Sequence, residues 1–380
     1  MSKPYLYTDY RFMTFCYFDF PPVHGILCGK GEHATEKQNV LMPYIICLTS
    51  FAISFLAIPP LISLANNKGV VALPGHRHIH AYPTPKFGGI AIAFSVLFIS
   101  PFVLSQDRVI GTYLLSSAIM LILGIIDDIR GSSWSVKLGF SLAATSVLIF
   151  GGDVYVRSLG DLFGLGEIHL GMWGIPFTYF AVFGVTNAIN LIDGLDGLAC
   201  GISSIAFLTF AVFASVSGND TVFYLSVANF GATLGLIRYN YPKAKIFMGD
   251  SGSLFLGFSL AVCAVLLAQG EGSMKPMVPV LVLGIPIFDT VRVMLFRVLN
   301  KRHPFRGDKT HLHHLMARSG ITKRRVVKSI WLLSALMSAL SFVLYRLNSW
   351  IMLLVFCILV ISMGVFIENL RIIKSSASRR

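Results

Sequence analysis

Long apolar segments alternate with short polar ones along most of this 380-residue chain. A helix needs about 20 mainly apolar residues to cross the hydrocarbon core of a bilayer. Windows of that size predict eleven transmembrane helices, at 43–66, 88–105, 109–126, 137–151, 172–190, 198–217, 220–238, 252–269, 277–297, 327–345 and 349–367. We therefore expect an all-α, polytopic membrane protein.

The composition agrees with this pattern. Hydrophobic residues make up 55% of the chain and charged residues 13%, whereas soluble proteins carry about 25% charged residues. A net charge of +13 is compatible with nucleic-acid binding, but the basic residues stand in short loops between apolar runs. The expected partner is therefore the lipid bilayer and not a nucleic acid.

Basic residues concentrate in alternate loops, which predicts the orientation of the chain. The basic loops lie near 68–86, 130–137, 238–245 and 301–325. The opposite loops contain Arg108, Arg157, Lys275 and Arg346. Because loops rich in Lys and Arg face the cytoplasm, we expect the N-terminus outside and the C-terminus inside.

The predicted helices form one transmembrane domain at 42–370, followed by a basic cytoplasmic tail at 371–380. No internal repeat is visible in the sequence. Residues 1–41 are aromatic but lack a clean apolar run, so we expect a poorly ordered extension there. Two alternatives stay open for it, namely an upstream start codon assigned in error and an amphipathic anchor.

Five polar clusters fall on the predicted cytoplasmic side, at 74–89, 125–131, 187–197, 245–253 and 306–315. Clusters on one face of a membrane favour a single composite site built from several loops. Independent solvated loops are the alternative.

Three of these clusters supply carboxylate and amide oxygens. Asp127 and Asp128 end a predicted span, and repulsion between adjacent carboxylates favours a group that accepts a proton. Asn187, Asn190 and Asp193 are three residues apart, so a helix would place them on one side. Such oxygens suit Mg²⁺, which binds through one or two carboxylates plus substrate phosphates.

The remaining chemistry lies in two further motifs. Asp250 stands in a glycine-rich turn that opens a predicted span, where a divalent cation carrying phosphates is favoured. His311, His313 and His314 invite a zinc interpretation, but basic neighbours such as Arg306 favour anion recognition instead. Carboxylates for a hard metal, cations for phosphates and a membrane beneath them are typical of phosphoryl transfer onto a lipid.

The chain resembles the polyprenyl-phosphate N-acetylhexosamine-1-phosphate transferases of glycosyltransferase family 4, and within them the bacterial undecaprenyl-phosphate N-acetylglucosamine-1-phosphate transferases. The similarity covers roughly residues 60–330. It is carried by the stretches "HAYPTPKFGG", "IIDDIRG…SVK", "NAINLIDGLDGL", "FMGDSGS" and "DKTHLHHL", which are specific as an ordered set.

The resemblance implies a role for each matching position. The metal ligands would be Asp250 and Asn190, holding Mg²⁺ or alternatively Mn²⁺. The catalytic residues would be Asp127, Asp128, Asp193 and His311. The substrate-binding residues would be Lys137, Asn187, Asp196, Phe247, Arg306, His313 and His314, with Phe247 and Asp196 at the uracil. Gly88 and Gly89 would let the first cytoplasmic loop pack closely.

One position departs from the family pattern. The family usually has an aspartate two residues before the proline that matches Pro74, and here that residue is Ala72. We expect this difference not to touch the metal or nucleotide positions.

The resemblance implies the transfer of N-acetylhexosamine 1-phosphate, by default GlcNAc 1-phosphate, from a UDP-sugar to undecaprenyl phosphate with release of UMP. This would begin O-antigen, common-antigen or another envelope polysaccharide at the cytoplasmic face of a bacterial inner membrane, with a homodimer as one allowed assembly. The nearest rival is a phospho-N-acetylmuramoyl-pentapeptide transferase. A secondary transporter is the rival from another class, but transporters usually show repeated halves.

Overall fold

The computed structural model describes residues 33–72, 83–103, 108–270, 272–301 and 310–377. Most of these residues are helical, which confirms the predicted all-α fold. The strands in the described ranges are β1 (Val71–Ala72) and β2 (Thr84–Pro85), which pair antiparallel with Val71 opposite Pro85.

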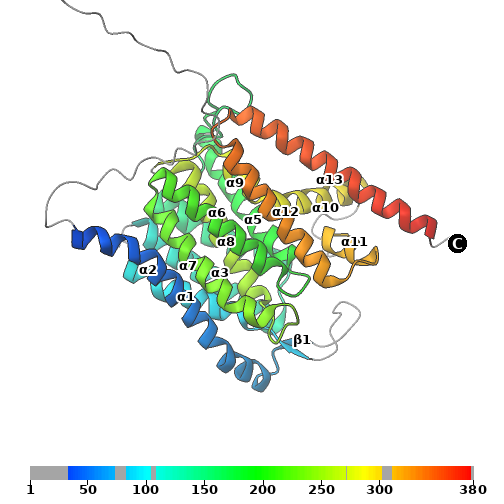
Figure 1. Ribbon diagram of the computed structural model, residues 1–380, viewed down its shortest axis with the longest axis horizontal. Helices are drawn as coiled ribbons and strands as arrows, with labels where there is room; N and C mark the ends of the chain where they lie inside the picture. The colour runs from blue at the N-terminus through cyan, green and yellow to red at the C-terminus, as the bar shows by residue number, and fades with distance from the viewer. Residues whose placement is uncertain (1–32, 73–82, 104–107, 271, 302–309, 378–380) are drawn as a thin grey trace, which may run out of the picture. The chain divides into compact units, whose positions relative to one another are not determined.

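The helices follow the apolar windows closely (Figure 1). They are α1 (His33–Asn67), α2 (Gly88–Val103), α3 (Arg108–Arg130), α4 (Trp134–Ser146), α5 (Gly174–Ile192), α6 (Leu198–Ser217), α7 (Asp220–Asn240), α8 (Gly249–Gln269), α9 (Met277–Val282), α10 (Gly284–Leu299), α11 (Leu312–Arg318), α12 (Lys323–Leu344) and α13 (Ser349–Ala377). A π-helical turn, Val147–Gly151, continues α4, and a 3₁₀ turn, Gly171–Trp173, precedes α5.

Over the described ranges, nine helices are long and apolar enough to cross a membrane. The protein is therefore a multi-pass membrane protein. The predicted span at 88–105 corresponds to α2, a shorter apolar helix of 16 residues. The predicted orientation of the termini stays a prediction.

The expectation of one continuous helix at 277–297 is wrong, because α9 and α10 are separate helices that meet at Leu283. Pro286 has no backbone N–H to continue the ladder from α9. Gly284 also packs closely against α12, since a Cβ atom there would lie 2.7 Å from the Met337 methyl group. Hydropathy does not register either effect, because all these residues are apolar.

The ends of the chain differ in part from the predicted boundaries. Helix α1 begins at His33, so residues 33–41 of the predicted extension are helical. Helix α13 continues to Ala377, into the predicted tail. Residues 1–32 and 378–380 lie outside the described ranges.

Helix α8 is central to the helix packing, with α2, α3, α5, α6 and α7 all in contact with it. Its start is packed by glycines. A Cβ atom on Gly89 would lie 2.0 Å from the Gly252 nitrogen, and one on Gly124 would lie 2.3 Å from the Ser251 Cα atom. Only backbone without side chains fits at these distances, so the predicted close packing at Gly88 and Gly89 is confirmed.

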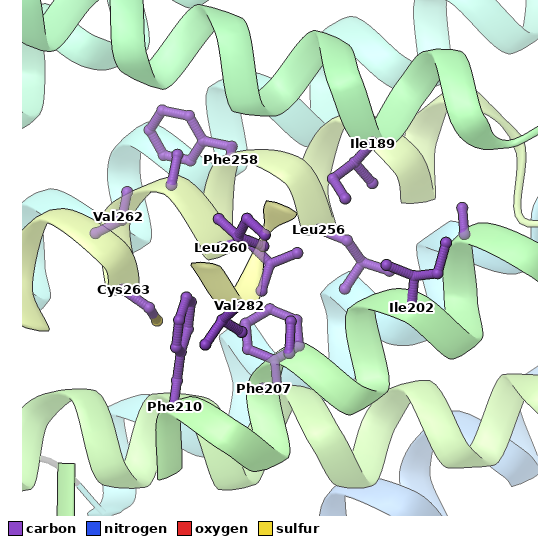
Figure 2. Packing of buried hydrophobic residues seen from close by; sticks show 14 of the residues in the cluster. Ile189, Ile202, Phe207, Phe210, Leu256, Phe258, Leu260, Val262, Cys263 and Val282 are labelled. Carbon is purple, nitrogen blue, oxygen red and sulfur yellow. The ribbon is translucent and has the colours of Figure 1, made fainter. Parts of the chain in front are cut away.

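Large apolar side chains fill the space around α8. Figure 2 shows Phe207 and Phe210 of α6 beside Leu260 and Cys263 of α8, with Val282 of α9 next to them. All five residues are almost completely buried. This packed core holds the middle of α8, whose first turn carries Asp250.

Candidate active site

The loop before α8 is held by backbone hydrogen bonds to the start of α2. Phe247 donates its N–H to the Pro85 carbonyl at 2.7 Å, and its own carbonyl accepts from Gly88 at 2.9 Å. Gly249 then has φ +73°, a left-handed conformation that glycine adopts without strain. The chain therefore turns sharply at Gly249 and places Asp250 in the first turn of α8.

Asp128, near the end of α3, holds this turn. Its two carboxylate oxygens accept hydrogen bonds from the backbone nitrogens of Asp250 (2.9 Å) and Ser251 (3.0 Å). The first N–H groups of a helix have no partner within the helix, and a carboxylate there also interacts favourably with the helix dipole. Asp128 therefore positions the start of α8.

The neighbouring carboxylate has a different set of contacts. Asp127 pairs with the Lys137 ammonium on α4, 2.5 Å from its Oδ2 atom. Lys137 also reaches Asp250 Oδ1 at 3.3 Å. Asn190 of α5 donates its amide to the same Asp250 oxygen and to Ser253 Oγ at 2.8 Å. One network thus joins α3, α4, α5 and α8 at Asp250.

Helix α5 ends at Ile192, and the loop that follows contributes two further carboxylates. Asp196 accepts the backbone N–H of Ala244 at 3.1 Å, which ties this loop to the loop before α8. Burial raises the pKa of Asp193 to about 8, and repulsion by Asp250, Asp128 and Asp196 adds to the shift. Without a cation nearby, Asp193 is therefore largely protonated at neutral pH.

The carboxylates of Asp128, Asp193, Asp196 and Asp250 line a polar cavity of about 240 Å³, which we call the acidic cleft, whereas Asp127 and Lys137 are not among its wall residues. Its walls are Ala72, Lys86, Asp128, Asn190, Asp193, Gly194, Leu195, Asp196, Asn240, Phe247, Met248, Gly249, Asp250, Ser253 and His314. The clusters of five separate stretches thus meet at one site, as the sequence predicts. Ala72 is among the wall residues, so the expectation that this position lies away from the metal and nucleotide positions is wrong.

The histidine segment packs against the rim of the acidic cleft. His313 lies on Gly194, where a Cβ atom would come within 2.2 Å of the imidazole Nε2 atom. Burial lowers the pKa of His313 to about 3, helped by the neighbouring His314. His313 is therefore neutral, and it contacts the cleft wall as an uncharged ring.

A second cavity lies along α5, and its lining is almost entirely apolar. This apolar groove of about 370 Å³ lies between α5, α8, α9 and α10. Asn187 lines it, so the expectation that Asn187 faces the acidic cleft with Asn190 is wrong. Between residues three apart, a helix rotates by about 300° and rises by about 4.5 Å. Asn187 therefore points into the neighbouring cavity.

Some predicted residues lie elsewhere, and sequence reasoning missed others. Arg306 lies outside the described residues. His311 is not a wall residue of the cleft, but hydrogen-bonds Asp289 of α10 at 2.8 Å. Asp289 was missed, although a lone Asp inside the apolar run 277–297 was the available signal.

The acidic cleft fits a hard divalent cation. Its donors are carboxylate and amide oxygens, and Mg²⁺ needs only one or two carboxylates when phosphates and waters complete its shell. Among the described residues, no three His, Cys, Asp or Glu side chains are grouped as ligands for one ion. The residues present therefore suit a metal that arrives with phosphates better than a cage made wholly by the protein.

The fold and the two cavities define a class of protein, namely an integral membrane protein that has an acidic cleft and an apolar groove along the same helix, α5. The glycosyl transferase family 4 model matches residues 110–268. A Bacillus subtilis (strain 168) protein named "Probable undecaprenyl-phosphate N-acetylglucosaminyl 1-phosphate transferase" is 34% identical over 87% of this chain and 92% of that protein. The chain therefore belongs to glycosyl transferase family 4.

Two further relatives carry the same type of name. Proteins called undecaprenyl-phosphate alpha-N-acetylglucosaminyl 1-phosphate transferase in Haemophilus influenzae and Escherichia coli (strain K12) are 33% and 30% identical. The matches cover 82% and 77% of this chain, and 90% and 82% of the respective proteins.

Proposed function

We propose that this protein transfers N-acetylglucosamine 1-phosphate from its UDP-sugar to undecaprenyl phosphate. A phosphate oxygen of the lipid attacks the β-phosphorus of the nucleotide sugar. The bond from that phosphorus to the bridging oxygen breaks, UMP leaves with the electron pair, and a lipid-linked pyrophosphoryl sugar stays in the membrane.

The observation that carries this proposal is that the acidic cleft and the apolar groove lie next to each other along α5. Asn187 lines the apolar groove and Asn190 lines the acidic cleft. They stand three residues apart, a rise of about 4.5 Å along the helix. A polyprenyl chain in the groove would therefore present its phosphate at the cleft, where the polar part of the donor binds.

The contacts suggest a division of labour among the side chains. Lys137 supplies a positive charge between Asp127 and Asp250, where the phosphates would meet. Asp127 is the candidate base for a protonated lipid phosphate, because its carboxylate faces Lys137 and does not cap a helix. Phe247 and Asp196 both line the acidic cleft, where the nucleotide would bind. Positioning and charge neutralisation of this kind are the main protein contributions to phosphoryl transfer.

Asp250 and Asn190 are the residues that would hold Mg²⁺, with Mn²⁺ as an alternative ion. When bound, such an ion neutralises charge on the phosphate oxygens. The carboxylate of Asp193, at the same cleft, gains its negative charge more readily beside a cation.

The proposed setting is the inner membrane of a bacterium, with the acidic cleft on the cytoplasmic side where nucleotide sugars are made. The basic loops near the cleft, around Lys86 and Lys137, support this orientation. The product would begin an envelope polysaccharide such as O-antigen or common antigen.

The test is UMP release by the purified protein in lipid nanodiscs, with undecaprenyl phosphate as acceptor. The donors are UDP-GlcNAc, UDP-GalNAc and UDP-MurNAc-pentapeptide, and omission of the lipid is the control. Lipid-dependent UMP release from UDP-GlcNAc supports the proposal. Release from UDP-MurNAc-pentapeptide alone would assign the protein to the peptidoglycan step, and binding of donor without any release would exclude transfer.

A further inference from the structure

Asp289 is a buried carboxylate inside an apolar part of the chain. It lies in α10 and is 1% exposed. A charge at such a place is costly unless it is paired and hydrogen-bonded. Its partners therefore indicate what it is for.

Apart from Arg292 on the same helix, the hydrogen-bond partners of Asp289 in the described part of the chain are His311 and Leu312, in the short segment Thr310–Leu312. One carboxylate oxygen lies 2.8 Å from His311 Nδ1, and the other accepts the backbone N–H of Leu312 at 2.8 Å. Arg292, one turn along α10, donates to the second oxygen at 2.9 Å and to the Thr310 carbonyl at 2.6 Å. The pair Asp289–Arg292 thus docks this segment on α10.

The contact with His311 has a chemical consequence beyond docking. An ionised carboxylate only accepts hydrogen bonds, so His311 Nδ1 must carry a proton. In the neutral ring, Nε2 is then the nitrogen that can accept a hydrogen bond or a proton. His311 is 3% exposed, and its Nε2 atom is buried without a hydrogen-bond partner among the described residues. A buried nitrogen of this kind ordinarily has a polar partner, so its orientation matters to what surrounds it.

The geometry connects His311 with the acidic cleft. Its ring is parallel to that of His313, with 6.0 Å between centroids. His313 lies on Gly194 and, on its other side, 4.2 Å from the ring of His314, and both Gly194 and His314 are cleft-wall residues. The ring held by Asp289 is therefore one member of a packed row that reaches the cleft.

Helix α10 also borders the apolar groove, but with its other face. Ile287, Val291 and Met294 line the groove. At about 100° per residue they stand about 140–200° around the helix from Asp289. The same helix thus carries the groove wall on one face and the histidine anchor on the other.

We infer that Asp289 is a positioning residue, which holds His311 in a single tautomer and ring orientation beside the acidic cleft. It acts through His311 and does not itself touch substrate. The kinetic part of this inference rests on the proposed function, whereas the tautomer of His311 does not.

The first test is spectroscopic and needs no turnover. Solid-state ¹⁵N spectra of histidine-labelled protein in lipid, with His311→Gln to assign the signals, should show His311 protonated at Nδ1. In Asp289→Asn this signature should be lost, because the amide NH₂ group replaces an acceptor. A neutral wild-type His311 with its proton on Nε2, or an unchanged signature in Asp289→Asn, would overturn the inference.

The matched control is Arg292→Gln, which removes a second anchor of the segment but leaves the Asp289–His311 contact. It should retain the Nδ1–H signature and keep kcat within about threefold of wild type. Asp289→Asn should lower kcat roughly 10- to 100-fold, the range for loss of a partner that orients a functional histidine, with KM for both substrates little changed. Equal losses in the two variants would show that docking alone matters.

A double variant decides whether Asp289 works through His311. In the His311→Gln background, Asp289→Asn should lower kcat no further, because the ring that it orients is absent. If each substitution lowers kcat by its own factor and the two factors multiply in the double variant, the inference is refuted. If wild-type protein releases no UMP from any donor, the proposed function fails, and the ¹⁵N spectra still decide the role of Asp289.

Discussion

Asp127 and Asp128 are adjacent and chemically identical, yet their contacts predict opposite consequences when each is changed to asparagine. Asp128 accepts two backbone N–H groups at the start of α8, at 2.9 and 3.0 Å. Asparagine keeps one acceptor oxygen and turns an NH₂ group toward the other N–H. The Asp128→Asn variant should therefore lose stability as well as activity.

The magnitude follows from the bonds that are lost. A hydrogen bond to a charged group contributes about 1.5–3 kcal/mol, and a carboxylate at a helix N-terminus adds about 0.3–1 kcal/mol. Losing one such bond and the charge should cost about 2–3 kcal/mol. For a chain of 380 residues that corresponds to a fall in Tm of about 3 °C.

Asp127→Asn should lose activity but keep its thermal stability. Lys137 keeps its contact with Asp250 at 3.3 Å, the amide oxygen still accepts from it, and the neutral amide removes the repulsion between Asp127 and Asp250, so Tm should change by about 1–2 °C at most. If Asp127 is the base, kcat should fall by about 10²-fold or more.

The assays are thermal unfolding in detergent and UMP release, run on the same preparations. Asp153→Asn is the control for loss of an acidic charge, because Asp153 lies in an exposed loop paired with Arg157. It should leave Tm and kcat unchanged. Equal falls in Tm for Asp127→Asn and Asp128→Asn would refute the assignment of the helix cap to Asp128 alone.

Four further outcomes are expected. Asp250→Asn should abolish UMP release while the protein still inserts into the membrane. Near-wild-type turnover would show that Asp250 is not a metal ligand. Asn190→Ala should raise the Mg²⁺ concentration needed for half-maximal rate, and Asp196→Ala should mainly raise KM for the nucleotide sugar; equal effects on both parameters would contradict this division. Because the pKa of Asp193 is raised to about 8, Mg²⁺ binding should release protons and tighten from pH 6.5 to 8.5 by calorimetry, whereas the Mg²⁺ affinity of Asp193→Asn should depend much less on pH. Deleting residues 2–41 should preserve activity, and a well-inserted but inactive truncation would show that the extension matters.

The sequence was sufficient for the parts of the fold that depend on composition and local pattern. Apolar windows located the long helices, and the glycine-rich turn before α8 could be read from "FMGDSGS", because Gly249 has the left-handed backbone that such a turn requires. Hydropathy could not locate the break between α9 and α10. A proline within an apolar run kinks some helices and ends others, and close packing of Gly284 on α12 is a tertiary fact.

The candidate site was predictable as a set of residues but not as a set of contacts. Asp127 and Asp128 differ because α3 presents one to Lys137 and the other to α8, and nothing local distinguishes them. Asn187 and Asn190 carry the same side chain one turn apart, yet they line different cavities.

The separation of Asn187 from Asn190 also bears on how one site can serve two substrates of opposite polarity. A lipid acceptor needs an apolar channel, and a nucleotide donor needs a polar cleft closed to hydrocarbon. Helix α5 borders both cavities. In the proposed reaction the phosphates of acceptor and donor would therefore meet at its last turn, while the polyprenyl chain stays in the apolar groove and the nucleoside stays in the acidic cleft. Polar residues at three-residue spacing at the end of an apolar helix are then explained by the boundary itself. Asn187 faces the apolar groove, Asn190 faces the acidic cleft, and the turn between them sets how far a lipid phosphate would have to reach from one cavity to the other.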